Sequence, residues 1–440
     1  MKKLSALWRK MRGERSTQMA LLLRVIQVVS GPVNSLLLVL GMSIEEQGIY
    51  YLFMGLLAVR IVFELGAATA IGQLAGHSML PETSAVDPHF VVAVNRWMWR
   101  AALAMAAVTR AGGVGFLVWQ GHGTVRTVLA WLLMVAGFAG GLCVEGRLSV
   151  LYGSGRLRRF FEIRLVNVGI LVLGNWILLL SGAGLFSFGT ALLLSLGATE
   201  YLCWKTDASL FSRGDGADPE ALGRHSGRIR GMLSKVSCVS LPFYLFANIQ
   251  SMVCLHCLGA SSLAVLGFVT SIGSSAIGMS SVWLHASLPE LTALAAKQEY
   301  EAARRFYRHR LLLTLGGVAA GFCASVAAVW FLGHWERFSQ RLPPWPVCLL
   351  VFGGISAQNV MAALVVWPRA FLLEPFGAIG IGQLVAMPFL MWVGALHYGV
   401  LGLAGACLAV WVLGLAAVPW KWPRSLGAAG TAGGAMPHRR

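Results

Sequence analysis

The chain consists of long apolar runs separated by short polar segments, and each run is about as long as a membrane-crossing helix. A helix needs roughly 20 apolar residues to cross the hydrocarbon core of a bilayer. This pattern predicts an all-α, polytopic membrane protein with about 12 transmembrane helices. The predicted spans cover residues 18–41, 48–76, 98–119, 128–151, 161–180, 183–204, 236–258, 263–285, 311–332, 345–367, 376–396 and 399–420. Only a tight turn near Gly399 separates the last two.

The longest polar segment, residues 205–235, divides the predicted spans six and six. A half with six spans returns the chain to its starting side, so two such halves would be parallel repeats. We therefore expect two six-helix bundles, joined by a cytoplasmic linker and flanked by a basic amphipathic N-terminus and a cytoplasmic tail. In residue numbers these parts are 1–17, 18–204, 205–235, 236–420 and 421–440.

The composition agrees with a membrane protein and gives an orientation. The chain is 57% hydrophobic and 12% charged, against about 25% charged in soluble proteins. Of the 35 Lys and Arg residues, 28 belong to the segments on the N-terminal side of the membrane when Arg100 and Arg164, at the inner ends of their spans, are counted with them; three fall in the opposite loops and four inside spans. Cytoplasmic loops carry the excess of Lys and Arg. Both termini are therefore predicted to be cytoplasmic, and the net charge of +17 does not indicate nucleic acid.

Two charged residues, Arg60 and Glu64, lie near the middle of the second predicted span. A charge at that depth costs about 2.5–3.5 kcal/mol even on the scale derived from translocon insertion. The i, i+4 spacing places both side chains on one helical face, where they can pair. Such residues face a protein interior or an aqueous path and indicate a functional site. A structural ion pair that sets helix register is the alternative.

Arginine suits a phosphate because its planar guanidinium donates bidentate hydrogen bonds. Four arginines lie within spans of the first half, and they are the candidate cavity residues there: Arg24, Arg60, Arg110 and Arg147. Arg24 and Arg147 lie near the inner ends, so snorkelling to the interface is an alternative for them. The acidic residues Glu64 and Glu145 are candidates for counter-charges or for carriers of a coupled proton or sodium ion.

The spans between residues 236 and 332 contain no Lys, Arg, Asp or Glu. They carry amide and hydroxyl side chains instead, and Asn248 and Gln250 are the candidate cavity residues of the second half. We expect a cavity that is charged on the first half and neutral on the second, which suits a sugar. Cys254, His256 and Cys257 are too few for a structural metal site, which wants four ligands, and no cofactor or metal is predicted.

Three short stretches resemble the bacterial polysaccharide and O-antigen flippases, the lipid-linked oligosaccharide exporters of the multidrug/oligosaccharidyl-lipid/polysaccharide superfamily. The first is similar to the second span of that family, the next to its fourth span and following basic loop, and the last to the inner end of its eighth span. They are 46–53 (EQGIYYLF) with 63–66 (FELG) and 73–75 (QLA), then 144–147 (VEGR) with 155–156 and 161–164 (FEIR), and 288–291 (LPEL).

The resemblance implies two six-helix bundles around a central cavity, alternating access and no enzyme chemistry. It implies that the chain moves lipid-linked, polyprenyl-pyrophosphate repeat units across the inner membrane for exopolysaccharide or lipopolysaccharide synthesis. Membrane lipid, the lipid-linked oligosaccharide, a proton or sodium ion, and a polymerase with its assembly proteins are the implied partners. Lipid II flippases resemble this fold but carry additional helices, so a count of twelve argues against that subgroup.

Three other functions stay open. A cation-coupled multidrug antiporter of the same superfamily would want an acidic cavity, whereas four in-span arginines here face two central glutamates. A membrane glycan polymerase or ligase needs a large outer loop, and the longest outer segment, about 333–344, is short. An unrelated carrier with twelve spans and a long central loop would share this topology, and only the family-like stretches count against it.

Overall fold

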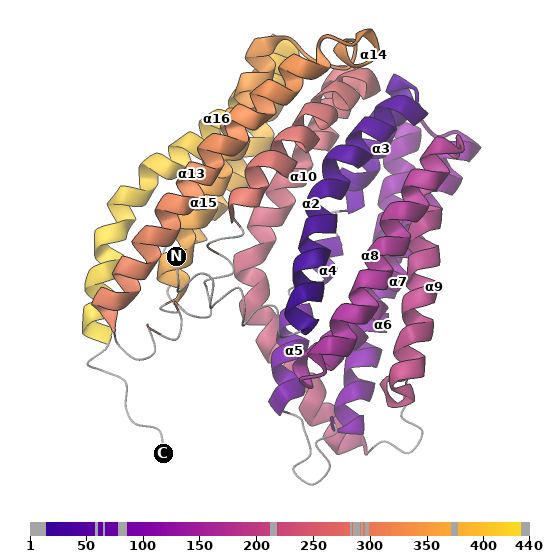
Figure 1. The fold of residues 1–440 in the computed structure, drawn as a ribbon, viewed down its shortest axis with the longest axis vertical. Helices are drawn as coiled ribbons and strands as arrows, with labels where there is room; N and C mark the ends of the chain where they lie inside the picture. Colours follow the sequence, from indigo (N-terminus) through magenta and orange to yellow (C-terminus); the bar gives the residue numbers. More distant parts are fainter. Residues whose placement is uncertain are drawn as a thin grey trace. The chain divides into compact units, whose positions relative to one another are not determined.

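The computed structural model describes residues 15–57, 60–64, 67–77, 86–211, 218–281, 299–370 and 377–432, with Leu284, Leu291 and Leu294. Across these residues the secondary structure is helical, with no β-strand (Figure 1). Contacts group the chain into two compact units, each of which is described by itself. Unit 1 is Met1–Glu46 with Phe53–Leu245, and unit 2 is Gln47–Leu52 with Phe246–Arg440. The domain boundaries expected from the sequence stay predictions.

Unit 1 contains a bundle of long helices preceded by three shorter ones that together cover the second predicted span. Helix α7 packs against α5, α6 and α9, and α8 packs against α2 and α9 (Figure 1). The elements are α2 (Arg15–Gly41), α3 (Ile44–Leu57), α4 (Arg60–Glu64), α5 (Ala67–His77), α6 (Pro88–Trp119), α7 (Val125–Gly153), α8 (Leu157–Leu180), α9 (Phe186–Thr206) and the 3₁₀ turn η1 (Ala208–Phe211).

Side-chain caps begin two of these helices. Asp87 accepts a hydrogen bond from the backbone N–H of His89 at 2.9 Å and starts α6 one residue before Pro88. Thr124 accepts one from the N–H of Thr127 at 3.2 Å and starts α7. Both caps satisfy backbone donors that a helix leaves without partners in its first turn.

Helix α10 (Pro219–Gly278) begins in the segment expected to be a polar linker and continues into the following spans. Helix α10 belongs to unit 1 up to Leu245 and to unit 2 from Phe246 on. Among the helices that follow it in unit 2, α15 packs against both α13 and α16. They are η2 (Met279–Ser281), α13 (Tyr300–Leu332), α14 (Glu336–Ser339), α15 (Trp345–Ala370) and α16 (Gly377–Ala432).

Single glycines divide α10 and α16 into two helices each. Gly259 has φ 84° and ψ 174°, and Gly399 has φ 60° and ψ −140°. A positive φ is strained for residues with a Cβ, which explains glycine at both breaks. Around Gly399 the chain folds back on itself, since a Cβ added to Gly394 would lie 2.5 Å from the carbonyl oxygen of Gly402. The tight turn predicted between the last two spans is therefore present.

Eight helices in the described residues are long and apolar enough to cross a membrane. Two of them, Ile249–Ser281 and Val385–Val418, each contain one of the glycine breaks. Shorter helices, α3 to α5, cover the second predicted span. The helical content and the arrangement of spans agree with the predicted fold class of about 12 transmembrane helices.

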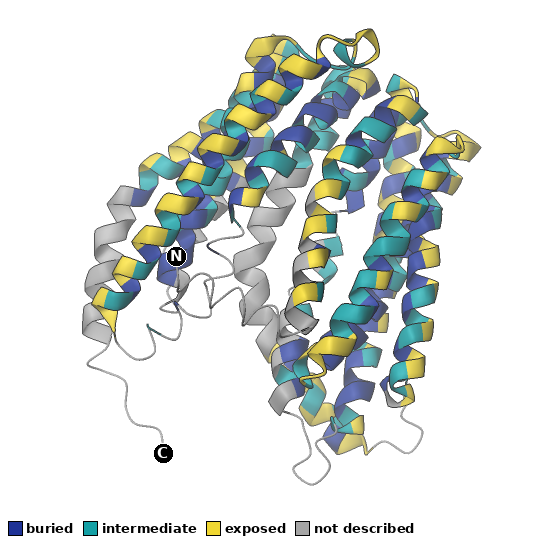
Figure 2. Ribbon diagram, in the orientation of Figure 1, coloured by how far each residue is buried: buried dark blue, intermediate teal, exposed yellow. Residues whose placement is uncertain are grey.

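The long helices of unit 1 carry an apolar face directed away from the bundle as well as one directed into it. Trp131 is buried on α7, where its Nε1 donates to the carbonyl of Thr109 at 3.2 Å and its ring lies 5.1 Å from Phe53. Outside, Ile177 and Leu180 on α8 are more than 60% exposed, and exposed residues follow the helices as stripes (Figure 2). Apolar surface of this extent marks a membrane interface, so the chain is a multi-pass membrane protein.

Candidate functional site

Arg60 and Glu64 form the ion pair that their spacing predicts. They are the first and last residues of α4, with Arg60 Nε 3.5 Å from a carboxylate oxygen of Glu64. This separation is long for a hydrogen bond, and Nε is buried without a hydrogen-bond partner among the described residues. The guanidinium of Arg60 is therefore held by charge, with donor capacity left over.

The Arg60 side chain reaches across to α7. Its guanidinium carbon lies 5.8 Å from the centre of the Phe138 ring. A Cβ added to Gly141 would lie 3.8 Å from Nη1 of Arg60. Phe138, Gly141 and Glu145 follow one another at spacings of three and four, so they share one face of α7. Glycine at position 141 leaves room for the guanidinium on the face that also carries Glu145.

Glu145 forms the second ion pair of this region. Its carboxylate accepts a hydrogen bond from Nη1 of Arg164 on α8 at 2.8 Å. Glu64 interacts electrostatically with Glu145 and Arg164 as well as with Arg60. We call Arg60, Glu64, Glu145 and Arg164 the charged quartet. It contains two carboxylates and two guanidinium groups, so the quartet has no net charge when both glutamates are ionised.

The side chains of the quartet are between 14% and 28% exposed. Groups buried to this extent among apolar helices lose most of their hydration, and the mutual attraction of a buried pair only roughly offsets that loss. A bundle held together by apolar packing alone needs no such cluster. The arrangement can exchange partners: an anion can replace Glu64 at Arg60, and a proton or metal cation can then neutralise the released carboxylate.

A cavity of about 700 Å³ opens beside the quartet. Glu145 is the member of the quartet that lines it, together with Ser149 and Tyr152 of α7. Gly72 of α5 and Phe160 of α8 lie on other walls. Polar atoms and an acidic group at the wall of an open cavity make it accessible to water and ions, so Glu145 is in reach of dissolved ions.

Arg147 belongs to a different place in unit 1. It forms an ion pair with Glu200 of α9, and its guanidinium carbon lies 4.1 Å above the centre of the Phe211 ring. Residues two apart in a helix are about 200° apart around its axis. Arg147 and Glu145 therefore point to different sides of α7, and the four in-span arginines of the first half do not form one cluster.

Three other candidate residues, two of the first half and one of the second, are only partly described. Arg110 is exposed on the outer side of α6, next to the buried Thr109. Arg24 lies in α2, but its side chain is outside the described part of the structure. The same holds for Asn248 in α10. The assignment of these three residues to a substrate site stays a prediction.

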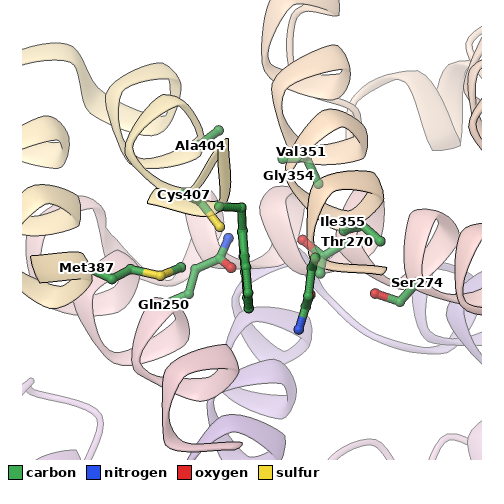
Figure 3. A pocket seen from close by; sticks show the side chains of 11 residues that line it. Gln250, Thr270, Ser274, Val351, Gly354, Ile355, Met387, Ala404 and Cys407 are labelled. Carbon is green, nitrogen blue, oxygen red and sulfur yellow. The ribbon is translucent and has the colours of Figure 1, made fainter. Parts of the chain in front are cut away.

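Unit 2 contains a cavity of about 160 Å³ whose lining is uncharged (Figure 3). It lies between α10, α15 and α16, and Gln250, the remaining candidate of the second half, is on its wall. Thr270 and Ser274 contribute hydroxyl groups, and Gln358 and Trp411 contribute an amide and an indole. The hydroxyl of Thr270 is buried and has no hydrogen-bond partner in the described structure. Donors and acceptors without charge suit a neutral polar group.

Within the described residues no group of three or more His, Cys, Asp or Glu side chains is placed to hold a metal ion. Cys254 is buried and His256 exposed on α10. Glu64, Glu145 and Glu200 of unit 1 are each paired with an arginine instead.

The fold was compared with known proteins. No family model matches the sequence, and no curated protein matches it. Solved structures do match over nearly the whole chain. An inward-facing multidrug resistance MATE family transporter of the MOP superfamily has a TM-score of 0.61 and 15% identity, covering 93% of this chain and 96% of that one. The Vibrio cholerae MATE transporter VcmN has a TM-score of 0.61 and 15% identity, with coverages of 97% and 99%.

The lipid II flippase MurJ, in an inward closed conformation, has a TM-score of 0.61 and 12% identity. The match covers 90% of this chain and 86% of the flippase. These identities are too low to assign a function, but the shared architecture is clear. The chain has the fold of the MOP-superfamily transporters. The matched structures are transporters and flippases and not enzymes.

Sequence reasoning missed the partners of the two in-span pairs that join different helices. The charge distribution grouped Arg164, the fourth residue of the predicted span 161–180, with the inner segments, but α8 already begins at Leu157 and carries Arg164 within the bundle. Glu200, the partner of Arg147, lies near the end of α9 and drew no attention. The one available signal was the presence of an acidic residue inside an apolar run. At Glu200 this signal is equally consistent with a residue at the membrane interface.

Proposed function

We propose that the chain exports lipid-linked polysaccharide repeat units across the inner membrane by alternating access, taking the pyrophosphate of the lipid carrier at Arg60. The observation that carries the proposal is the guanidinium of Arg60, whose Nε is buried without a hydrogen-bond partner among the described residues and lies 3.5 Å from a carboxylate oxygen. A pyrophosphate offers oxygen acceptors that fit the planar fork of arginine. The uncharged cavity of unit 2 supports a substrate that also carries sugar hydroxyls.

The quartet supplies a mechanism for loading and release. In the unloaded protein Glu64 neutralises Arg60, so the charge is not left alone among apolar helices. An arriving pyrophosphate competes with Glu64 for the guanidinium and displaces it. The freed carboxylate then binds a proton or a sodium ion, and loss of that ion returns Glu64 to Arg60 and releases the substrate. Glu145, on the wall of the open cavity, provides the route by which the ion reaches the quartet.

Reconstituted vesicles test the role of Arg60. A polyprenyl-pyrophosphate oligosaccharide is placed in the inner leaflet, and its appearance in the outer leaflet is measured by enzymatic capture. Arg60→Ala should lower the rate roughly 10- to 100-fold, because a hydrogen-bonded charge is worth about 1.5–3 kcal/mol. The transport rate of Arg60→Lys should lie between those of the unchanged protein and Arg60→Ala, since lysine keeps the charge and loses the planar fork of donors. Arg304→Ala, which removes an exposed arginine of α13, is the matched control.

A second change separates substrate binding from neutralisation. If Arg60 and Glu64 serve only to neutralise each other, export lost in Glu64→Gln should return in the double change to Gln at both positions, and this recovery would count against Arg60 as the pyrophosphate ligand. Absence of recovery is the expected result, because the double variant lacks the ligand as well as the carboxylate. Normal export by Arg60→Ala, with the protein correctly inserted, would remove the basis of the proposal.

A cation-coupled multidrug antiporter is the second candidate function, and the electrostatic interaction between Glu64 and Glu145 favours it. Two carboxylates in electrostatic contact are suited to exchange protons for an organic cation. Such a transporter would depend on Glu64 and Glu145 and tolerate Arg60→Ala. Proton-driven uptake of a fluorescent cationic dye into everted vesicles distinguishes the two, since the lipid exporter should show none above the background of vesicles without the protein.

The remaining partners follow from the proposed substrate. A polysaccharide polymerase and its assembly proteins would receive the exported units, and the lipid carrier places the chain in a bacterial inner membrane. The excess of Lys and Arg in the predicted inner segments supports cytoplasmic N- and C-termini.

A further inference from the structure

A second polar cavity of unit 1, away from the quartet, is lined by three arginines. It has a volume of about 510 Å³ and lies between the first half of α6, the inner end of α7 and η1. The arginines are Arg96, Arg100 and Arg147, and Trp99 and Phe211 supply aromatic walls. No acidic residue lines it among the described residues. The volume falls within the range of about 300–1,000 Å³ that is usual for ligand pockets.

The spacing of residues on α6 concentrates these groups on one face. Val92, Asn95, Arg96 and Trp99 follow at intervals of three, four and seven, which is the periodicity of a single helical face. Arg96 and Arg100 are exposed, and within the described chain neither has an ion-pair partner. Their charge is therefore available to a ligand in the cavity, since none of the described acidic residues neutralises it.

The back of the cavity is rigidly built. Asn95 donates a hydrogen bond from Nδ2 to the carbonyl of Leu210 at 2.8 Å, which holds η1 against α6. Arg147 is stacked on Phe211 and paired with Glu200, so its guanidinium cannot swing away. Its Nε is buried and has no hydrogen-bond partner among the described residues. A ligand that brings an anionic oxygen to this position would satisfy it.

The cavity lies at the depth of a lipid headgroup in the predicted orientation. Trp99 is 52% exposed beside the two arginines, and tryptophan is enriched at the level of the headgroups. Arg96 and Arg100 belong to an inner segment by the distribution of positive charge, where the anionic lipids of the cytoplasmic leaflet attract basic residues.

We infer that this cavity binds the phosphate of an anionic phospholipid headgroup in the cytoplasmic leaflet, with Arg96 and Arg100 as the contacting cations and Trp99 against the glycerol and upper acyl chain. A free phosphate shares the charged group but lacks the apolar part that Trp99 would cover. The site is separate from the transported substrate and goes beyond the proposed function, because none of its contacting residues belongs to the quartet.

Native mass spectrometry of the full-length protein tests the site. The purified protein is titrated in detergent with phosphatidylglycerol or phosphatidylcholine, and bound lipids are counted. We expect saturable binding of phosphatidylglycerol, weakened about tenfold or more by Arg96→Gln/Arg100→Gln, because each basic residue near a lipid surface contributes about 1 kcal/mol. Arg96→Lys/Arg100→Lys should retain part of the binding, and Trp99→Ala should weaken it separately.

Arg304→Gln/Arg308→Gln is the matched control, since it removes two exposed arginines at the same i, i+4 spacing from α13. Equal loss of binding in this control and in the α6 double variant would reduce the effect to general surface charge and overturn the site. Equal binding of phosphatidylcholine and phosphatidylglycerol by the unchanged protein would also overturn the site. Displacement of the lipid by millimolar inorganic phosphate would assign the cavity to a soluble anion and contradict the lipid assignment.

Discussion

Glu145 and Arg147 lie two positions apart on α7 and belong to two different ion pairs. Glu145 accepts a hydrogen bond from Arg164 on α8, whereas Arg147 pairs with Glu200 on α9 and stacks on Phe211. The two charges are close in sequence, yet they do not neutralise each other. Because α7 turns each of them towards a different neighbour, it ties α8 and α9 to itself through polar contacts on two sides.

The pair formed by Arg147 and Glu200 should stabilise the packing of α7 on α9. Glu200→Gln leaves Arg147, which is only 10% exposed, without its counter-charge. Removing one partner of a fully buried pair costs about 3–5 kcal/mol, and partial exposure of Glu200 should reduce this to roughly 2 kcal/mol. Thermal unfolding of the purified protein in detergent, followed by tryptophan fluorescence, measures the change.

The double variant Arg147→Met/Glu200→Met controls for the loss of charge itself. Replacing both partners with apolar side chains avoids an uncompensated charge, so it should recover most of the lost stability. A double variant less stable than Glu200→Gln would show that the pair contributes more than mutual neutralisation.

The close approach of Gly394 and Gly402 should make the last helical hairpin intolerant of side chains. Gly394→Ala would place its Cβ 2.5 Å from the carbonyl oxygen of Gly402, so the two helices must separate. We expect a loss of about 1–3 kcal/mol, as for other overpacked contacts. Gly382→Ala, in the same α16 with no atom within 4 Å of the added Cβ, should be neutral or stabilising by up to about 1 kcal/mol. Equal melting temperatures for the two variants would contradict this packing.

The unpartnered hydroxyl of Thr270 separates a structural from a binding role for the cavity of unit 2. Thr270→Val keeps the shape of the side chain and removes a buried polar group without a hydrogen-bond partner in the described structure. Stability should be unchanged or raised, since leaving such a group unsatisfied costs about 1–3 kcal/mol. If the cavity accepts a sugar hydroxyl, the same variant should slow transport in the vesicle assay. Lower stability with unchanged transport would refute that role.

The turn near Gly399 was predictable because the interruption is local. A glycine after His397 and Tyr398, between two apolar runs, is enough to end one helix and start another. The positive φ of Gly399 explains why this residue is glycine. The pair formed by Arg60 and Glu64 was predictable for a similar reason, since four positions in a helix bring two side chains together whatever surrounds them.

The start of α8 was less predictable. Leu157 to Phe160 form the first turn of the helix, where two arginines hydrogen-bond to Glu162 at 2.9 Å. Hydropathy counts these arginines as loop residues, because it measures preference for lipid and not the ability to form a helix that extends beyond the membrane. Arg164 was therefore counted with the basic inner segment at the start of the span, and its pairing with Glu145 was not expected.

The sequence by itself determined the class of protein, the approximate spans and the presence of charges inside the first half, because the cost of exposing polar groups to hydrocarbon acts on each segment independently. Only the tertiary structure decided which charges meet. The partners of Glu145 and Arg147 come from α8 and α9, and the neutral cavity of unit 2 is assembled from α10, α15 and α16. Contacts of this kind depend on how helices rotate and pack against one another, and the periodicity of a single helix does not specify that rotation.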